Sequence, residues 1–243
     1  MAVLVAGGAV AGFVNTLAGG GSFLTVPLLI FLGLPPTVAN ATNRVGVAAQ
    51  SLAAMGGFRQ ENVPGLRFAA SLLPATLLGS WLGAWAASSV SDRVFSVGFA
   101  VVMLAMLPVI LRNPKPRAPG ERAGMGLPLQ LGVYFAIGLY GGAVQAGIGI
   151  PLLLALVAAG GLDLVRANAV KVAVVAALTL VALAQFAAAG KVLWGYGLVL
   201  AVGSAIGGYA ASRFGARVGD RLIRPLLTLA VVAAALRLLS LSF

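Results

Sequence analysis

Two basic residues stand inside stretches of the chain that are otherwise apolar. Arg44 lies in VANATNRVGVAAQSLAAMGG, residues 38–57, and Lys171 lies in the apolar run 164–189. About 20 apolar residues suffice for a helix to cross a bilayer, and a charge inside such a helix is costly unless a partner, a cavity or a ligand compensates it. The first question is therefore what chemistry these two cations serve.

Both cations follow an ANA triplet, at 39–41 and at 167–169. Counted from the predicted helix starts, each lies about 10 Å deep, at about 1.5 Å per residue. If the two helices cross the membrane in opposite directions, the charges approach the midplane of the bilayer from either side, which describes an anion site. We predict that Arg44 and Lys171 supply its charge and that hydrogen bonds come from Thr42, Asn43 and Asn168.

Glycine-rich breaks interrupt the apolar segments before each cation. The first, AGGGS, separates the runs 2–17 and 23–33, and the second, AGIG, separates 127–145 and 149–160. Broken helices at corresponding places of two repeats are typical of transporter binding sites, and helix N-termini attract anions. The residues predicted to face the anion here are Gly19, Gly20, Gly21, Ser22, Gln145, Gly147 and Gly149, with Asn15, Thr16 and Thr25 as flanking hydrogen-bond groups.

Each of these features also has an interpretation without an anion. Arg44 and Lys171 are long enough to reach toward the lipid headgroups. The glycines at the breaks could serve close helix packing. The small-xxx-small pairs Gly79–Gly83 and Gly203–Gly207 favour packing within the chain first and a homodimer interface second.

The composition is that of an integral membrane protein. Of 243 residues, 60% are hydrophobic and only 9% are charged, and the mean hydropathy is +1.05, whereas soluble domains carry about 25% charged residues. The lipid bilayer is therefore one partner. The net charge of +11 comes from Lys and Arg in the gaps between apolar runs. No basic stripe interleaved with aromatic residues is present, so nucleic acid is not expected as a partner.

The chain lacks the usual reactive side chains. It contains no cysteine and no histidine, which excludes thiol chemistry, ordinary zinc sites and haem ligation through His or Cys. The acidic residues all fall in loops or at helix ends: Glu61, Asp92, Glu121, Asp163 and Asp220. With no acid or base predicted inside a span, we expect no enzyme activity, no catalytic residue, no metal site and no cofactor.

The chain divides into two similar halves. The stretch 112–126, rich in Pro, Gly and Arg, separates a first membrane repeat, 1–111, from a second, 127–243. Four landmarks recur in one order, among them GSWLGAWAAS in the first half and GSAIGGYAAS in the second, as expected after a duplication. The match is approximate at the cations, because alignment of the ANA triplets pairs Lys171 with the residue before Arg44.

The basic residues predict the topology. If each broken pair enters the membrane and returns, each half crosses an odd number of times and the halves are inverted. Of the 16 basic residues, 11 then share one face, three lie opposite and two are Arg44 and Lys171; an excess of Lys and Arg marks the cytoplasmic face. We predict an all-α integral membrane protein with two inverted repeats, each a glycine-broken, re-entrant helix pair plus three transmembrane helices. Loop 112–126 is then cytoplasmic and both termini lie outside.

At these motifs the chain resembles the sulfite exporter TauE/SafE family of membrane proteins. The similarity rests on GFVNTLAGGGSFLTVPLL and LGLPPTVANATNRV in the first half, and on IGLYGGAVQAGIGIPLLLAL and DLVRANAVKV in the second. The resemblance implies export of a small sulfur-containing anion, such as sulfite or an organosulfonate, across the inner membrane. Alternating access about the central site is the expected mechanism. A passive anion channel that uses the same cations is the alternative, and a scaffold without transport is the third interpretation.

Overall fold

The computed structural model describes residues 1–60, 66–112, 126–160, 162 and 164–214, together with five positions between 228 and 236. Within these ranges all regular secondary structure is helical, which confirms the predicted all-α class. The predicted linker 112–126 and the last apolar run, 219–241, lie almost wholly outside the described residues. The helices are α1 (Ala2–Ala18), α2 (Ser22–Phe31), α3 (Pro36–Gln60), α4 (Leu66–Ser89), α5 (Asp92–Arg112), α6 (Leu127–Ala143), α7 (Gly149–Gly160), α8 (Leu164–Ala188) and α9 (Trp194–Phe214).

Both predicted breaks are present. α1 ends just before Gly19, which has a φ of 79°, and between α6 and α7 the residues Gln145 and Gly147 have φ values of 64° and 74°. A positive φ costs glycine little and other residues more. Within the described ranges Gln145 is the non-glycine residue with such a φ, and its side-chain amide donates a hydrogen bond to the Thr179 hydroxyl of α8. This bond fixes the second break against α8.

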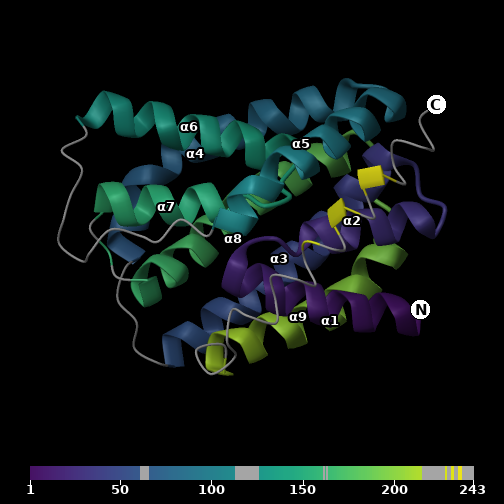
Figure 1. Cartoon of the computed structure of the whole chain (residues 1–243), viewed down its shortest axis with the longest axis horizontal. Helices are drawn as coiled ribbons and strands as arrows, with labels where there is room; N and C mark the ends of the chain where they lie inside the picture. The colour runs from purple at the N-terminus through teal and green to yellow at the C-terminus, as the bar shows by residue number, and fades with distance from the viewer. Residues whose placement is uncertain are drawn as a thin grey trace.

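The first helix of each half packs against the fourth helix of the other half. Figure 1 shows α1 beside α9 along one side of the molecule and α6 beside α4 along the other. A Cβ atom added to Gly8 of α1 would lie 2.7 Å from the Leu200 carbonyl oxygen of α9, and one added to Gly12 would lie 2.3 Å from the Ser204 carbonyl oxygen. Because these contacts advance in the same direction along both helices, α1 and α9 run parallel.

Helices α4 and α6 repeat this parallel arrangement. A Cβ atom added to Gly142 would lie 2.0 Å from a carbonyl oxygen of α4, and one added to Gly79 would lie 2.2 Å from a carbonyl oxygen of α6. Small residues allow backbones to approach this closely. The pairs Gly79–Gly83 and Gly203–Gly207 therefore pack within the chain, as predicted first. Helices α6 and α1 cover these glycines, and a homodimer of the chain stays a prediction.

Helices α3 and α8, which carry the two cations, run antiparallel between these pairs. Val45 near the start of α3 packs with Phe186 near the end of α8. Ala54 and Phe58 near the end of α3 pack with Val172 near the start of α8. This register sets the positions of Arg44 and Lys171 relative to each other.

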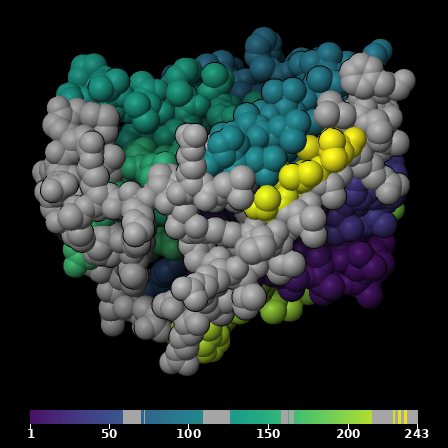
Figure 2. Space-filling model, in the orientation of Figure 1, coloured from purple at the N-terminus to yellow at the C-terminus, as the bar shows by residue number. Residues whose placement is uncertain are grey.

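Helix α5 packs against α2 and the C-terminal segment. The rings of Phe23 and Phe99 have centroids 6.5 Å apart, and Val231 and Ala235 belong to the same apolar cluster. In Figure 2 the described positions of this segment, in yellow, lie against α5. The cluster holds α2, and with it the first break, in place.

Many large apolar side chains are exposed on the outer surface of the described helices. The segment Arg166–Ala188 of α8 has the length and the mean hydropathy, 2.1, of a membrane span, whereas α1, α2 and α6 are apolar but shorter. Exposed apolar side chains are expected on a surface that faces lipid. They include Val10, Leu78, Trp81, Trp85, Val101, Trp194, Leu198, Val202 and Ile206.

Candidate functional site

Arg44 is fully buried and binds the C-terminal end of α6. Its Nη1 donates to the Gly141 carbonyl oxygen at 3.0 Å, and its Nη2 donates to those of Gly142 at 2.5 Å and Ala143 at 3.3 Å. The guanidinium carbon lies 4.8 Å from the ring centre of Phe186, close enough for cation–π attraction. The last carbonyls of a helix have no partner within it and carry partial negative charge. A helix end thus compensates the charge of Arg44.

Lys171 makes the corresponding contact at the end of α1. Its Nζ donates to the Thr16 carbonyl oxygen at 2.8 Å and to that of Leu17 at 3.5 Å, and the residue is 2% exposed. Each cation of one half therefore caps the first helix of the other half. Because both side chains are buried against helix ends, the interpretation that they reach toward the headgroups does not hold.

The two cations do not meet in this structure. Arg44 lies level with Phe186, whereas the neighbour of Lys171, Val172, packs against Ala54, ten residues further along α3. At 1.5 Å per residue, ten residues correspond to about 15 Å along the axis of α3, so the two side chains leave their helices at different heights. The predicted shared site is thus divided into two regions. We call the region around Arg44 the Arg44 level and the region around Lys171 the Lys171 level.

Asn43 joins the start of α2 to α3. Its Nδ2 donates to Ser22 Oγ at 3.0 Å, and its Oδ1 accepts a hydrogen bond from Thr25 Oγ1 at 2.5 Å. All three side chains are buried. The structure therefore brings the predicted residues Asn43 and Ser22 to the first break, where they bind each other.

Thr42 and Asn168 lie at other places. Thr42 Oγ1 accepts the Leu193 N–H at 3.0 Å, so it binds the connection between α8 and α9 and not a break. Asn168 lies one turn before Lys171, and its Oδ1 is buried without a hydrogen-bond partner among the described residues.

The two glycine breaks touch each other. A Cβ atom added to Gly19 would lie 2.3 Å from Gly149 Cα, and one added to Gly21 would lie 2.2 Å from the Ala11 carbonyl oxygen. Close packing therefore accounts for these three glycines, and their role as backbone donors stays a prediction, as it does for Gly20 and Gly147. Because α2 and α7 both begin at the breaks, the positive ends of two helices lie where the breaks touch.

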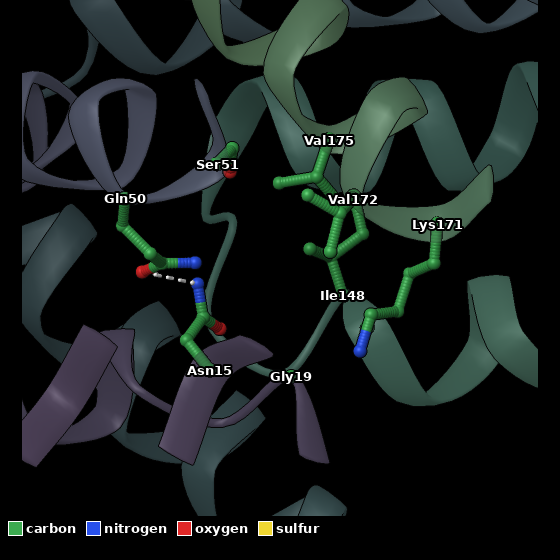
Figure 3. Close-up of a pocket in the computed structure, with 9 residues that line it drawn as sticks. Asn15, Gly19, Gln50, Ser51, Ile148, Lys171, Val172 and Val175 are labelled. Atoms are coloured by element: carbon green, nitrogen blue, oxygen red, sulfur yellow. Dashed lines mark hydrogen bonds between the residues drawn. The ribbon is translucent and has the colours of Figure 1, made fainter. Parts of the chain in front are cut away.

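A small pocket lies beside this contact (Figure 3). It has room for about one water molecule, so an anion can enter only if side chains or helices move. On one side of the pocket, Asn15 Nδ2 donates to Gln50 Oε1 at 3.1 Å. The wall is polar on one part and apolar on another, and is formed by Asn15, Gln50, Ser51 and Lys171, by Ile148, Val172 and Val175, and by Gly19 and Gly149.

Sequence reasoning missed Gln50 and Ser51. They follow the predicted site residues Asn43 and Arg44 by seven positions, which is about two helical turns, so each shares a face of α3 with its predecessor. Polar residues repeated at this spacing in an apolar helix are the signal that could have identified them.

A second set of polar contacts joins the two halves near the start of α3. Asp92 Oδ1 of α5 accepts hydrogen bonds from the Thr37 N–H at 2.9 Å and from its hydroxyl at 2.7 Å. Lys191, between α8 and α9, donates to Thr37 Oγ1 at 3.2 Å. Together with the Thr42–Leu193 bond, these contacts hold the first two turns of α3 against α5 and the connection between α8 and α9.

The chain is similar in sequence to a known protein family and to several known proteins. The family model described as Sulfite exporter TauE/SafE matches residues 4–238. The "Probable membrane transporter protein YfcA" of Escherichia coli (strain K12) is 30% identical over 230 residues, which cover 94% of this chain and 86% of that protein. A "Probable membrane transporter protein" of Haemophilus influenzae is 30% identical over 230 residues, with 94% and 90% covered. The "Probable membrane transporter protein ORF9" of Sinorhizobium sp is 26% identical over 242 residues, with 99% and 92% covered.

No solved structure matches the chain. The family model nevertheless spans nearly the whole sequence, and the relatives are matched over most of their length. Both describe membrane transporters and not enzymes. The protein is an all-α membrane transporter, and it belongs to the sulfite exporter TauE/SafE family.

Proposed function

We propose that the protein exports a small sulfur-containing anion, of the sulfite or organosulfonate class, across the inner membrane by alternating access. The observation that carries this proposal is the pocket at the touching glycine breaks, where the Lys171 ammonium and the N-terminus of α7 meet a wall of polar side chains. A cation and a positive helix end in a water-poor centre favour a negative ligand.

The repeat arrangement supports alternating access. Helix α1 is parallel to α9 and α6 is parallel to α4, with the glycine contacts exchanged between halves. The caps are exchanged in the same way, Arg44 on α6 and Lys171 on α1. Such reciprocal contacts are what two inverted repeats would make, and rocking of one repeat against the other would expose the pocket to each side in turn.

A carrier fits the packing better than a channel does. Gly19 lies against Gly149, and Thr37, near the start of α3, binds both Asp92 and Lys191. A channel needs a continuous path with weak binding along it. In the proposed carrier, the Lys171 level of the site faces the cytoplasm when the Arg44 level is closed.

Transport by purified protein in liposomes tests the proposal. With ethanesulfonate or sulfite inside, uptake of the same labelled anion from outside should rise, because a loaded carrier returns faster than an empty one. Uptake that is unaffected by internal anion would indicate a channel. No uptake of either anion above that of protein-free liposomes would contradict the proposed function.

Removal of the Lys171 charge should abolish most anion binding. Lys171→Met keeps the length and apolar bulk of the side chain, and loss of a charge–charge contact at low dielectric should weaken binding at least tenfold, about 1.4 kcal/mol. Titration calorimetry with ethanesulfonate measures this. Lys115→Met in the linker is the matched control and should bind like the parent. If Lys171→Met binds ethanesulfonate as tightly as Lys115→Met and the parent do, Lys171 is not part of the anion site.

A further inference from the structure

The Ser51 hydroxyl is a buried polar group for which the fold provides no partner. Ser51 is 0% exposed, and its Oγ has no hydrogen-bond partner among the described residues. A serine inside a helix commonly bonds the carbonyl one turn earlier, and a buried hydroxyl left unpaired costs about 1–3 kcal/mol. Ser51 lines the pocket that contains Lys171. Its free hydroxyl is therefore available to whatever enters that pocket.

The other polar groups of the pocket are also placed as donors. Asn15 Oδ1 already accepts the Gly21 N–H at 3.2 Å, and Asn15 Nδ2 occupies Gln50 Oε1. The Gln50 amide nitrogen points toward the interior of the pocket in Figure 3. An ammonium has three N–H donors, and Lys171 makes one short contact, with the Thr16 carbonyl. The pocket thus has hydrogen-bond donors of α3 on one side and the Lys171 ammonium of α8 on the other.

We infer that Ser51 is a specificity-determining residue of the anion site, which donates its hydroxyl to one oxygen of an oxyanion headgroup whose charge Lys171 compensates. This inference rests on the proposed function and names a residue of the same site. A headgroup with several oxygens can accept from Ser51, Gln50 and Lys171 at once. A halide, with a single spherical surface, gains less from donors that lie on opposite walls. Ser51 should therefore favour oxyanions over halides.

The experiment compares anion affinities of the purified full chain in detergent. Ethanesulfonate, sulfite and chloride are titrated at constant ionic strength against the parent, Ser51→Ala and Ser80→Ala. Ser80 is the matched control: it is equally buried, and it bonds the Leu178 carbonyl at 2.8 Å outside the pocket. We expect Ser51→Ala to bind both oxyanions about tenfold more weakly, with chloride binding unchanged, and Ser80→Ala to bind all three like the parent.

Several outcomes would overturn the inference while leaving the proposed function intact. One is oxyanion binding by Ser51→Ala that equals the parent's, and another is an equal loss of chloride binding. If the parent binds neither oxyanion, the proposed function itself fails, so the two failures are distinguishable.

A second variant keeps the inference testable if Ser51→Ala does not fold. Ser51→Cys is nearly isosteric, and a thiol is a weaker donor than a hydroxyl, so oxyanion binding should fall several-fold. Because the chain has no cysteine of its own, the introduced thiol is the single site for a maleimide. Ethanesulfonate should slow its labelling, whereas chloride should not. Labelling at a rate independent of ethanesulfonate would place the anion elsewhere.

Discussion

Arg44 and Lys171 each end at the carbonyl groups of a helix C-terminus, and this changes what removal of either charge should do. Lys171 also lines a pocket, whereas Arg44 is enclosed by α6 carbonyls and the Phe186 ring. Loss of Lys171 should thus act first on the ligand. Loss of Arg44 should act first on the fold.

Arg44→Met should lower stability, because three carbonyl groups of α6 lose their donor in a buried place. The expected loss is about 1–3 kcal/mol, the cost of leaving buried polar groups unpaired. Arg44→Lys should be intermediate, since an ammonium keeps the charge but cannot span the carbonyls as a planar guanidinium does. Thermal unfolding in detergent measures both, with Arg117→Met in the linker as the control. If Arg44→Met unfolds like the parent but loses anion binding, Arg44 contacts the anion directly, as the sequence predicts.

The sequence singles out unusual residues but does not show what they bind. Arg44, Lys171, Asn43 and the glycine breaks stand out because polar groups and glycines are costly in apolar helices. The partners of the two cations are main-chain carbonyls, such as those of Gly142 and Thr16, which about 100 or more residues of chain separate from them. A carbonyl leaves no mark in the sequence, so a helix end and an anion are equally good explanations of a buried cation.

At the scale of helices, the sequence predicts where each one begins and ends better than what it touches. The breaks fall where glycine permits a positive φ. The partner of α1, however, is α9 and not a sequence neighbour. Repeated small residues show that a close contact exists, but the same glycines would serve a second copy of the chain equally well. Only the packing of α4 against α6 in the structure shows that these glycines make a contact within the chain.

Substitution of two glycines of α6 distinguishes the effect of tight helix packing on stability from the effect of helix propensity. Gly142→Ala would place a Cβ 2.0 Å from the Ser80 carbonyl oxygen, whereas nothing lies within 4 Å of a Cβ at Gly132. Gly142→Ala should force α4 and α6 apart and cost about 1–3 kcal/mol, as overpacking does in well-packed cores. Gly132→Ala should be neutral or slightly stabilising, because alanine favours the helix. Thermal unfolding of the two variants compares them directly, and equal midpoints would show that α4 and α6 are not in close contact.

For the whole molecule, the number of crossings per half decides which connections share a face. If each broken pair enters and returns, Ser91, between α4 and α5, lies on the same face as Ala189 at the end of α8. If each pair crosses once, the two residues lie on opposite faces. In the structure Ala87 and Phe186 belong to one apolar cluster, so the ends of α4 and α8 lie close together. A shared membrane face for Ser91 and Ala189 stays a prediction of the inverted arrangement.

Single cysteines test this arrangement without any background, because the chain has none. Ser91, Gly126 and Ala189 are exposed at helix ends, so substitution by cysteine should be tolerated. An impermeant maleimide added to spheroplasts should label Ser91→Cys and Ala189→Cys. It should reach Gly126→Cys, at the end of the linker that we predict to be cytoplasmic, only after the membrane is permeabilised. Labelling of Ser91→Cys and Ala189→Cys from opposite faces would contradict the inverted repeats. It would also remove the basis for alternating access. In the proposed mechanism the two halves have opposite orientations and swap conformations, so that the Arg44 and Lys171 levels open in turn.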